Sequence, residues 1–333
     1  MPGVVDFSDV EDIDLDAMDG IPTGLPDLDK LLMKLFYGTL NIVTGINGSG
    51  KSSFLNQVIC RCLDEGENAY LFSGELPNFQ TKNWINFIFA GQRNVEQHTY
   101  NGSVYYKVLP EAKKAISNFY RGRLFIREDG HSKKKEDIMQ SMEDSVRKYG
   151  AKLIILDNMT AMDLGGSPDT RLTKQQELVN DLIEFAVKYQ VVVILVVHPH
   201  KIDMMRRLSK MDVQGVSAVI DLAHRIISLY RVQEKDKQGQ ASMRGGGYVV
   251  PPMNADVIID ILKDRMTGYE NGSVEVFYDK PSRRFFTTEA ELDHQYKWDS
   301  TMYTTPLPFP PPQLAVDEED GLDEPLGSAK NLE

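Results

Sequence analysis

The sequence predicts an α/β fold in which a mostly parallel sheet is covered by helices on both faces and is extended by antiparallel strands near the C-terminus. Strand-like runs alternate with amphipathic helical patterns between residues 39 and 197. The runs 152–157 and 191–197 are continuously apolar, as is typical of parallel strands buried on both faces. After residue 224 the helical patterns stop and strand-like segments follow one another closely.

Local patterns place each element within this fold. The expected helices cover residues 28–35, 51–65, 79–92, 110–120, 134–149 and 172–189. The expected strands cover residues 39–44, 69–73, 124–127, 152–157, 191–197, 225–232, 256–263, 274–279 and 284–288, with a mobile loop at 234–250. We therefore expect an acidic flexible arm over residues 1–20, a core over 21–290, and a proline-rich and acidic tail over 291–333.

Composition indicates a water-soluble protein and leaves the question of nucleic-acid binding open. The net charge of -12 argues against a polyanionic partner, but the acid is concentrated at the ends. Residues 1–20 carry seven carboxylates and no Lys or Arg, and residues 315–325 carry six more. No apolar run approaches the roughly 18–20 residues of a membrane helix, and the N-terminus lacks a signal-peptide pattern. With Cys60 and Cys62 expected to be buried and reduced, we predict a cytoplasmic location without a membrane partner, in the host cytoplasm if a phage encodes the chain.

A phosphate-binding loop lies between the first expected strand and its helix. The segment GINGSGKS, residues 45–52, fits the pattern G-x-x-x-x-G-K-[ST], and the strand before it and helix after it are the context that this pattern requires. A glycine-rich turn that binds nothing is the alternative, which this context argues against. We predict that the loop binds ATP, or another NTP or dNTP, with Mg²⁺. The residues expected to contact nucleotide are Gly45, Asn47, Gly48, Ser49, Gly50, Lys51, Ser52 and Ser53, with the Ser52 hydroxyl on the metal.

Hydrolysis requires further groups, and candidates follow three of the expected strands. Asp157 ends the strand KLIILD, where a carboxylate can hold the metal, although it could instead cap the next turn. Glu75 follows the second strand and could polarise the attacking water, or it could interact with the dipole of the next helix. His198 could sense the terminal phosphate or serve as a cap. It is a poor zinc ligand with His200, because no Cys or further His lies at ligand spacing.

Two cationic groups complete the set of candidates. Lys263 and Arg265 lie two apart at the end of a late strand, far along the sheet from the phosphate loop, so they are better placed to reach a neighbouring subunit's nucleotide than their own. A charged strand edge is the alternative. The basic segment after His198 could grip a nucleic-acid backbone without reading sequence, or it could be a solvated loop. Its cations are Lys201, Arg206, Arg207 and Lys210.

Taken together, these motifs resemble the DnaB group of hexameric replicative DNA helicases, and most closely its phage and Twinkle-like branch. The resemblance covers residues 21–288 and includes GINGSGKS, SGELP, LIILDNMTAMDL, VVHPHK and KDRMTG. It implies a RecA-like core assembled as a homo-oligomeric, hexameric ring that hydrolyses nucleotide between subunits and moves 5′ to 3′ on single-stranded DNA. It further implies that Lys263 and Arg265 act in trans, that Glu75 and Lys51 act in cis, and that Arg231 packs on the nucleotide base.

The sequence also departs from that family, and two other functions compete with the helicase. Many relatives carry an N-terminal primase or collar domain, which this sequence lacks, so we expect a separate primase or polymerase to dock on the acidic ends. A RecA-type recombinase or recombination mediator shares the core but exchanges strands, and KDRMTG and HPHK argue against it. A regulatory module that binds nucleotide without turnover is the other alternative, against which Glu75 argues.

Overall fold

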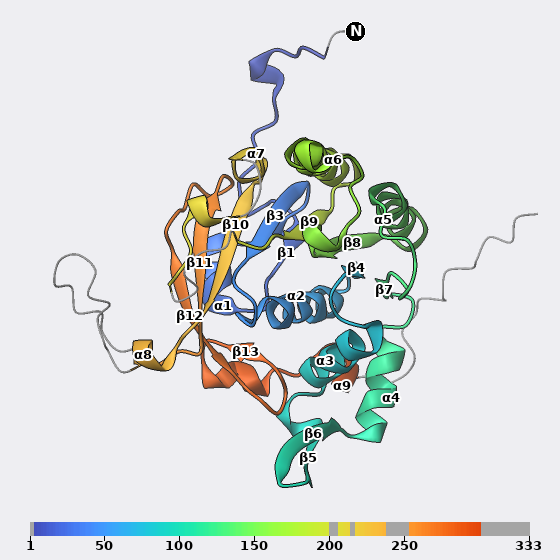
Figure 1. The fold of residues 1–333 in the computed structure, drawn as a ribbon, viewed down its shortest axis with the longest axis vertical. Helices are drawn as coiled ribbons and strands as arrows, with labels where there is room; N and C mark the ends of the chain where they lie inside the picture. Colours follow the sequence, from blue (N-terminus) through green and yellow to red (C-terminus); the bar gives the residue numbers. More distant parts are fainter. Residues whose placement is uncertain (1–2, 200–205, 214–216, 238–252, 301–333) are drawn as a thin grey trace, which may run out of the picture.

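The computed structural model describes residues 3–199, 206–213, 217–237 and 253–300, and within them nine strands form one central sheet (Figure 1). The strand order is β13-β12-β11-β10-β3-β9-β8-β4-β7. The strands from β10 to β7 are parallel, whereas β11, β12 and β13 pair antiparallel, so the predicted fold class is confirmed. Their bounds are β3 Thr39–Thr44, β4 Asn68–Ser73, β7 Leu124–Ile126, β8 Ala151–Asp157, β9 Val192–Val196, β10 Arg225–Arg231, β11 Val257–Asp264, β12 Ser273–Tyr278 and β13 Phe285–Phe286.

Helices cover both faces of this sheet. On β9, Val192 and Ile194 pack into one apolar cluster while Val193 and Leu195 pack into the other. Because both faces are buried, the parallel strands are apolar at consecutive positions. One face is covered by α1 Pro26–Leu32, α2 Lys51–Glu65, α3 Asn78–Ala90, α4 Pro110–Phe119 and α9 Lys297–Ser300, and the other by α5 Lys135–Tyr149, α6 Arg171–Tyr189 and α7 Ser217–Leu222.

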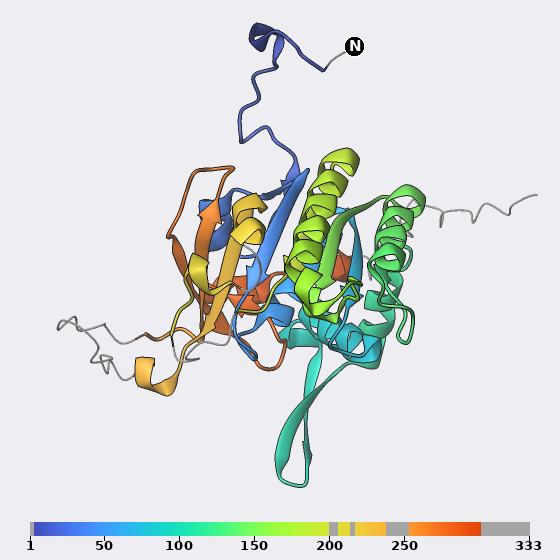
Figure 2. The same cartoon turned by 45° about the horizontal axis from the view of Figure 1, so that its top comes forward.

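A two-stranded hairpin was absent from the sequence prediction. Strand β5 Val95–Tyr100 pairs antiparallel with β6 Ser103–Val108, and the pair projects from the body beyond α3 and α4 (Figure 2). Asn101 and Gly102 form its turn with φ of 47° and 79°, a conformation that favours this residue pair. A second small sheet joins β1 Gly20–Ile21 to β2 Leu35–Phe36.

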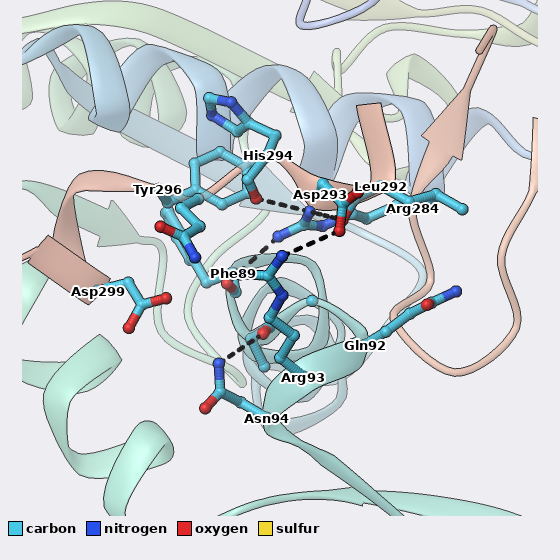
Figure 3. Close-up of a pocket in the computed structure, with 13 residues that line it drawn as sticks. Phe89, Gln92, Arg93, Asn94, Arg284, Leu292, Asp293, His294, Tyr296 and Asp299 are labelled. Atoms are coloured by element: carbon cyan, nitrogen blue, oxygen red, sulfur yellow. Dashed lines mark hydrogen bonds and ion pairs between the residues drawn. The ribbon is translucent and has the colours of Figure 1, made fainter. Parts of the chain in front are cut away.

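The packed region extends beyond the predicted boundary at residue 290. Tyr296 and Trp298 are buried, and the Trp298 indole donates to the Phe89 carbonyl at 2.9 Å. The Arg284 guanidinium holds the same segment by donating to the carbonyls of Leu292 and His294 (Figure 3). Polar groups that line the small pocket here hydrogen-bond to neighbouring backbone carbonyls. The core boundary expected at residue 290 therefore falls inside a folded segment.

Other differences from the expected elements are local. Residues 3–19 project from the body and contain one short 3₁₀ turn, η1 Phe7–Asp9 (Figures 1 and 2); their expected flexibility stays a prediction. The expected loop at 234–250 begins with the short helix α8 Glu234–Lys237, and most of its remainder lies outside the described residues. Cys60 and Cys62 are buried and unbridged, as expected. Among the described helices, none combines the length and apolarity needed to cross a bilayer.

Candidate active site

The phosphate-binding loop connects β3 to α2 and has the backbone that its glycines were expected to permit. Gly45 has φ of 150°, and a β-carbon there would lie 2.5 Å from the Leu229 carbonyl oxygen. Gly50 has φ of 99°, and a β-carbon there would lie 2.7 Å from the Phe285 ring. A side chain at Gly45 would clash with the backbone of β10, and one at Gly50 would displace the buried Phe285 ring, since real β-carbons do not approach so closely.

Lys51 and Ser52 begin α2 beneath this loop, and each has a polar partner. The Lys51 ammonium donates to the carbonyls of Gly45 at 2.8 Å and Ile46 at 3.0 Å. Its burial lowers the pKa of Lys51, although the nearby charges of Asp157 and Glu75 oppose this shift. The Lys51 ammonium is thus held against the loop itself, where a phosphate oxygen could replace those carbonyls. Ser53 lies one position further along the first turn of α2.

Asp157 lies at the end of β8 and faces Ser52. The Ser52 hydroxyl donates to the Asp157 carboxylate at 3.3 Å. Burial, and then the neighbouring charge of Glu75, raise the pKa of Asp157 to about 6. A hydroxyl and a carboxylate are the oxygen ligands that Mg²⁺ prefers, so these two side chains fit the predicted metal.

Glu75 follows β4 and His198 follows β9, and both contact Asn158, which follows β8, the strand between them. His198 Nε2 lies 2.9 Å from the Glu75 carboxylate and 2.8 Å from the Asn158 amide nitrogen. The Asn158 amide also donates to the Glu75 carboxylate. Its own oxygen accepts from the backbone N–H of Ala161 at 3.0 Å, which fixes the orientation of the amide. The candidate base and the candidate phosphate sensor are therefore linked by a fully buried amide.

Asn158 was not among the predicted site residues. In the sequence it directly follows Asp157, at the start of the next turn. The sequence did contain a signal for it: Asn158 is a polar residue that directly follows a buried strand ending in a carboxylate. Side chains in this position lie at the carboxyl ends of parallel strands, where ligands bind. Its neighbour Thr160 donates to the same amide oxygen at 2.5 Å and completes its hydrogen bonding.

Arg231 lies on the outer side of the phosphate loop. It ends β10, is exposed, and lines an open hollow together with Ile46, Asn47 and Gly48 of the loop. This position is compatible with the expected contact to a nucleotide base, since the hollow continues from the loop. The residues predicted to bind phosphate, to hold the metal, to activate water and to sense the terminal phosphate thus lie together at the carboxyl ends of the parallel strands.

Lys263 and Arg265 do not join that group. Strand β11 runs antiparallel to β10, and Arg225 pairs with both Asp264 of β11 and Asn41 near the start of β3. Arg265 therefore lies beyond the opposite ends of the strands, where β3 begins, about 17 Å from Gly45 along the strand direction. Arg265 is thus far from the phosphate loop, as expected. The distance between them runs along the strand direction, whereas the sequence predicted that it runs from strand to strand across the sheet.

The two cations also differ in their surroundings. The Lys263 ammonium donates to the carbonyls of Ile220 at 2.6 Å and Asp221 at 2.8 Å, at the end of α7. Its burial, and then the charge of Arg265, lower the pKa of Lys263 to about 8. Arg265 is exposed in the turn after β11. Of the two, Arg265 presents the accessible charge.

The predicted DNA-binding cations are paired with carboxylates where the structure describes them. Arg206 binds Asp212 at 2.6 Å, and Lys210 binds Glu270 at 2.7 Å. Arg207 donates through Nε to Asp260 at 2.9 Å. Lys201 lies outside the described residues. The positive charge that the sequence predicted for this segment is therefore compensated, by the nearby Asp212 and by Asp260 and Glu270, which are distant in sequence and are brought close by the fold.

Known proteins are similar to this chain in sequence pattern and in fold. Residues 20–287 match the family model described as the DnaB-like helicase C terminal domain. One similar solved structure, that of an ATPase domain, is 16% identical with a TM-score of 0.63, and the match covers 82% of this chain and 92% of that one. A second, "The Structure Of A DnaB-Like Replicative Helicase And Its Interactions With Primase", is 17% identical with a TM-score of 0.62, and the match covers 82% of this chain and 62% of that one.

Proposed function

Because this chain belongs to the family of DnaB-like helicase C-terminal domains, whose members are NTP-hydrolysing DNA helicases, we propose that it works as a ring, translocating 5′ to 3′ on single-stranded DNA. The observation that carries this proposal is the division of the candidate site between two edges of the sheet. The phosphate loop, Asp157, Glu75 and His198 lie at one edge, while Arg265 lies at the other. A subunit of this shape needs a neighbour to complete its site, and a closed ring of six supplies one to every subunit.

Within one subunit, the side chains divide the chemistry of hydrolysis. Lys51 would exchange its loop carbonyls for phosphate oxygens, and the loop N–H groups would bind the same charge. Ser52 and Asp157 would hold Mg²⁺, which neutralises phosphate charge when bound. Glu75 would accept the proton of the attacking water. Arg231 is proposed to contact the base, since it lines the hollow beside the loop.

Asn158 and His198 would position Glu75 and report the nucleotide state. The His198 Nε2 can donate to the Glu75 carboxylate or accept from the Asn158 amide, but it cannot do both at once. A terminal phosphate near His198 would compete for its proton and leave the carboxylate with the amide alone. Loss of that phosphate would restore the contact between His198 and Glu75. The movement of His198 would be passed to the segment that follows it in the chain.

From the neighbouring subunit, Arg265 would reach the transferred phosphate as an arginine finger. Its exposure and its place at the opposite edge support this role. Lys263 would act beside it, provided that its ammonium leaves the carbonyls of Ile220 and Asp221. Both roles in trans depend on the assembly of identical subunits.

DNA would be bound through the segment containing Arg206, Arg207 and Lys210, together with Lys201. Since three of these cations are paired with carboxylates, DNA phosphates would have to replace Asp212, Asp260 and Glu270. Such an exchange costs little for Lys210 and Glu270, which are both exposed, and more for Arg206 and Arg207, because it leaves the buried carboxylates of Asp212 and Asp260 without them. Binding to DNA phosphates would be weak at high salt. One related protein was solved with its interactions with primase; by analogy, we propose that the acidic ends of this chain dock a separate primase or polymerase.

Unwinding assays test the central proposal. The purified chain, with ATP and Mg²⁺, should separate a labelled fork that has a free 5′ tail and should fail on a fork with only a 3′ tail. Glu75→Gln should retain nucleotide binding and abolish unwinding, whereas Glu136→Gln, on the far helix α5, should behave as wild type. Strand exchange without fork separation would overturn the proposal in favour of a recombinase.

A further inference from the structure

The β5–β6 hairpin has one face that is rich in aromatic side chains and lies away from the body. Because His98 is opposite Tyr105 and Tyr100 is opposite Ser103, these residues share a face of the pleated pair. The His98 and Tyr105 rings stack at 5.4 Å, and the Lys107 ammonium lies 5.5 Å from the Tyr105 ring centre. We refer to His98, Tyr100, Ser103, Tyr105 and the flanking pair Glu96 and Lys107 as the aromatic face.

This aromatic face is not covered by the described part of the chain. Tyr100 is 70% exposed and Tyr105 is 37% exposed. An isolated two-stranded hairpin is at best marginally stable in water, so a ribbon of this length gains from any surface that covers it. With one acid and one base, the aromatic face also favours an uncharged ligand over a polyanion.

The chain supplies such a ligand beside the root of the hairpin. Helix α9 packs against α4, and Asp299 lines the same small pocket as Asn94, the residue before β5 (Figure 3). The chain therefore leaves the described structure next to the hairpin. Residues 301–316 carry no charge, and residues 306–312 read PLPFPPP, with five prolines in seven positions. Such a sequence is preorganised as a polyproline helix, the form that aromatic surfaces bind.

The lengths also agree. Position 306 is the sixth residue after Ser300, which allows about 20 Å of extended chain. Each hairpin strand has six residues and spans about 20 Å, and seven residues of polyproline helix span about 22 Å. We propose that the aromatic face binds residues 306–312 of the same chain, with proline rings packed on Tyr100 and Tyr105. The acidic segment 317–324 would then start beside the hairpin.

Disulfide trapping in the full chain tests this directly. Ser103→Cys combined with Phe309→Cys should form a bridge within one chain on mild oxidation, seen as a faster-migrating band without reductant. Thr99→Cys combined with Phe309→Cys is the matched control, because Thr99 lies near the same end of the hairpin on its opposite face. Cys60 and Cys62 are fully buried and should not interfere. Equal bridging in both variants, no bridging, or bridging only between chains would overturn the proposal.

Amide hydrogen exchange gives an independent measurement. Replacing the five prolines of residues 306–312 by glycine should make the hairpin amides exchange about tenfold faster, because the cover that stabilises them is weakened. Neutralising the acids at 317–320 should leave that exchange unchanged. Unchanged hairpin exchange in the glycine variant would refute the contact, whatever the outcome of the unwinding assays.

Discussion

Replacing Asn158 by alanine tests whether the buried amide positions the catalytic carboxylate. The substitution removes the hydrogen bond from the Asn158 amide to Glu75 and leaves the His198 contact at 2.9 Å in place. A hydrogen bond to a charged group contributes roughly 1.5–3 kcal/mol. Since the Glu75 side chain is 51% exposed, water replaces part of that contribution and the lower limit applies. About 1.5 kcal/mol corresponds to a loss in kcat of roughly tenfold.

Steady-state hydrolysis over a range of ATP and DNA concentrations separates this effect from weakened binding. The KM for ATP should change less than twofold, because none of these hydrogen bonds of Asn158 joins it to the phosphate loop. Asn158→Asp provides a matched variant of the same shape. It should be slower than Asn158→Ala, since a carboxylate there would repel Glu75 and add to the charge near Asp157. A kcat that stays at the wild-type value in both variants would refute the positioning role.

Four further predictions follow from contacts described above. Arg265→Ala should abolish hydrolysis, and mixing it with Lys51→Ala subunits should restore part of it; mixtures without rescue would contradict a site shared between subunits. If the Lys263 charge is needed, hydrolysis should fall as pH rises above about 8, because its lowered pKa removes the proton there, and Lys263→Arg should retain activity to higher pH in the same titration. Glu270→Gln should tighten single-stranded DNA binding up to about fivefold in fluorescence titrations, since it frees Lys210 from an exposed pair worth at most ~1 kcal/mol; weaker binding would argue against exchange. Trp298→Ala should lower the free energy of unfolding by about 3–5 kcal/mol in urea, and a loss below ~1 kcal/mol would exclude residues 296–300 from the core.

The parallel part of the fold was predictable because its strands are mostly apolar and buried on both faces. Residues 152–157 and 191–197 could be recognised without tertiary information, and their helices followed from helical spacing. The hairpin was missed because its strands, VEQHTY and SVYYKV, are exposed and contain no apolar run. The sequence feature that could have predicted the hairpin is Asn101-Gly102, because Asn-Gly is the pair that a two-residue hairpin turn prefers.

The candidate site was predictable to the extent that it depends on strand ends. Glu75, Asp157 and His198 each follow an apolar run, and parallel strands bring such positions to one edge. The ion pairs of the basic segment could not be anticipated, because Asp260 and Glu270 lie more than fifty residues beyond Arg207 and Lys210. Local charge therefore indicated a cationic surface where the fold supplies compensating acids.

The direction of β11 has a consequence for how assembly and hydrolysis are linked. Had this strand run parallel to β3, Lys263 and Arg265 at its end would have faced the same edge as the phosphate loop, and one subunit could have held a complete site. Because β11 is antiparallel, the turn carrying Arg265 is at the far edge, where Asp264 fixes it by accepting from the N–H of Met266 at 2.9 Å and pairing with the buried Arg225 at 2.9 Å. If Arg265 is the arginine finger proposed above, it is held on a side of the subunit from which it would not reach its own nucleotide. Under that proposal, fast hydrolysis would require a neighbouring subunit, so nucleotide would be consumed mainly where subunits have assembled.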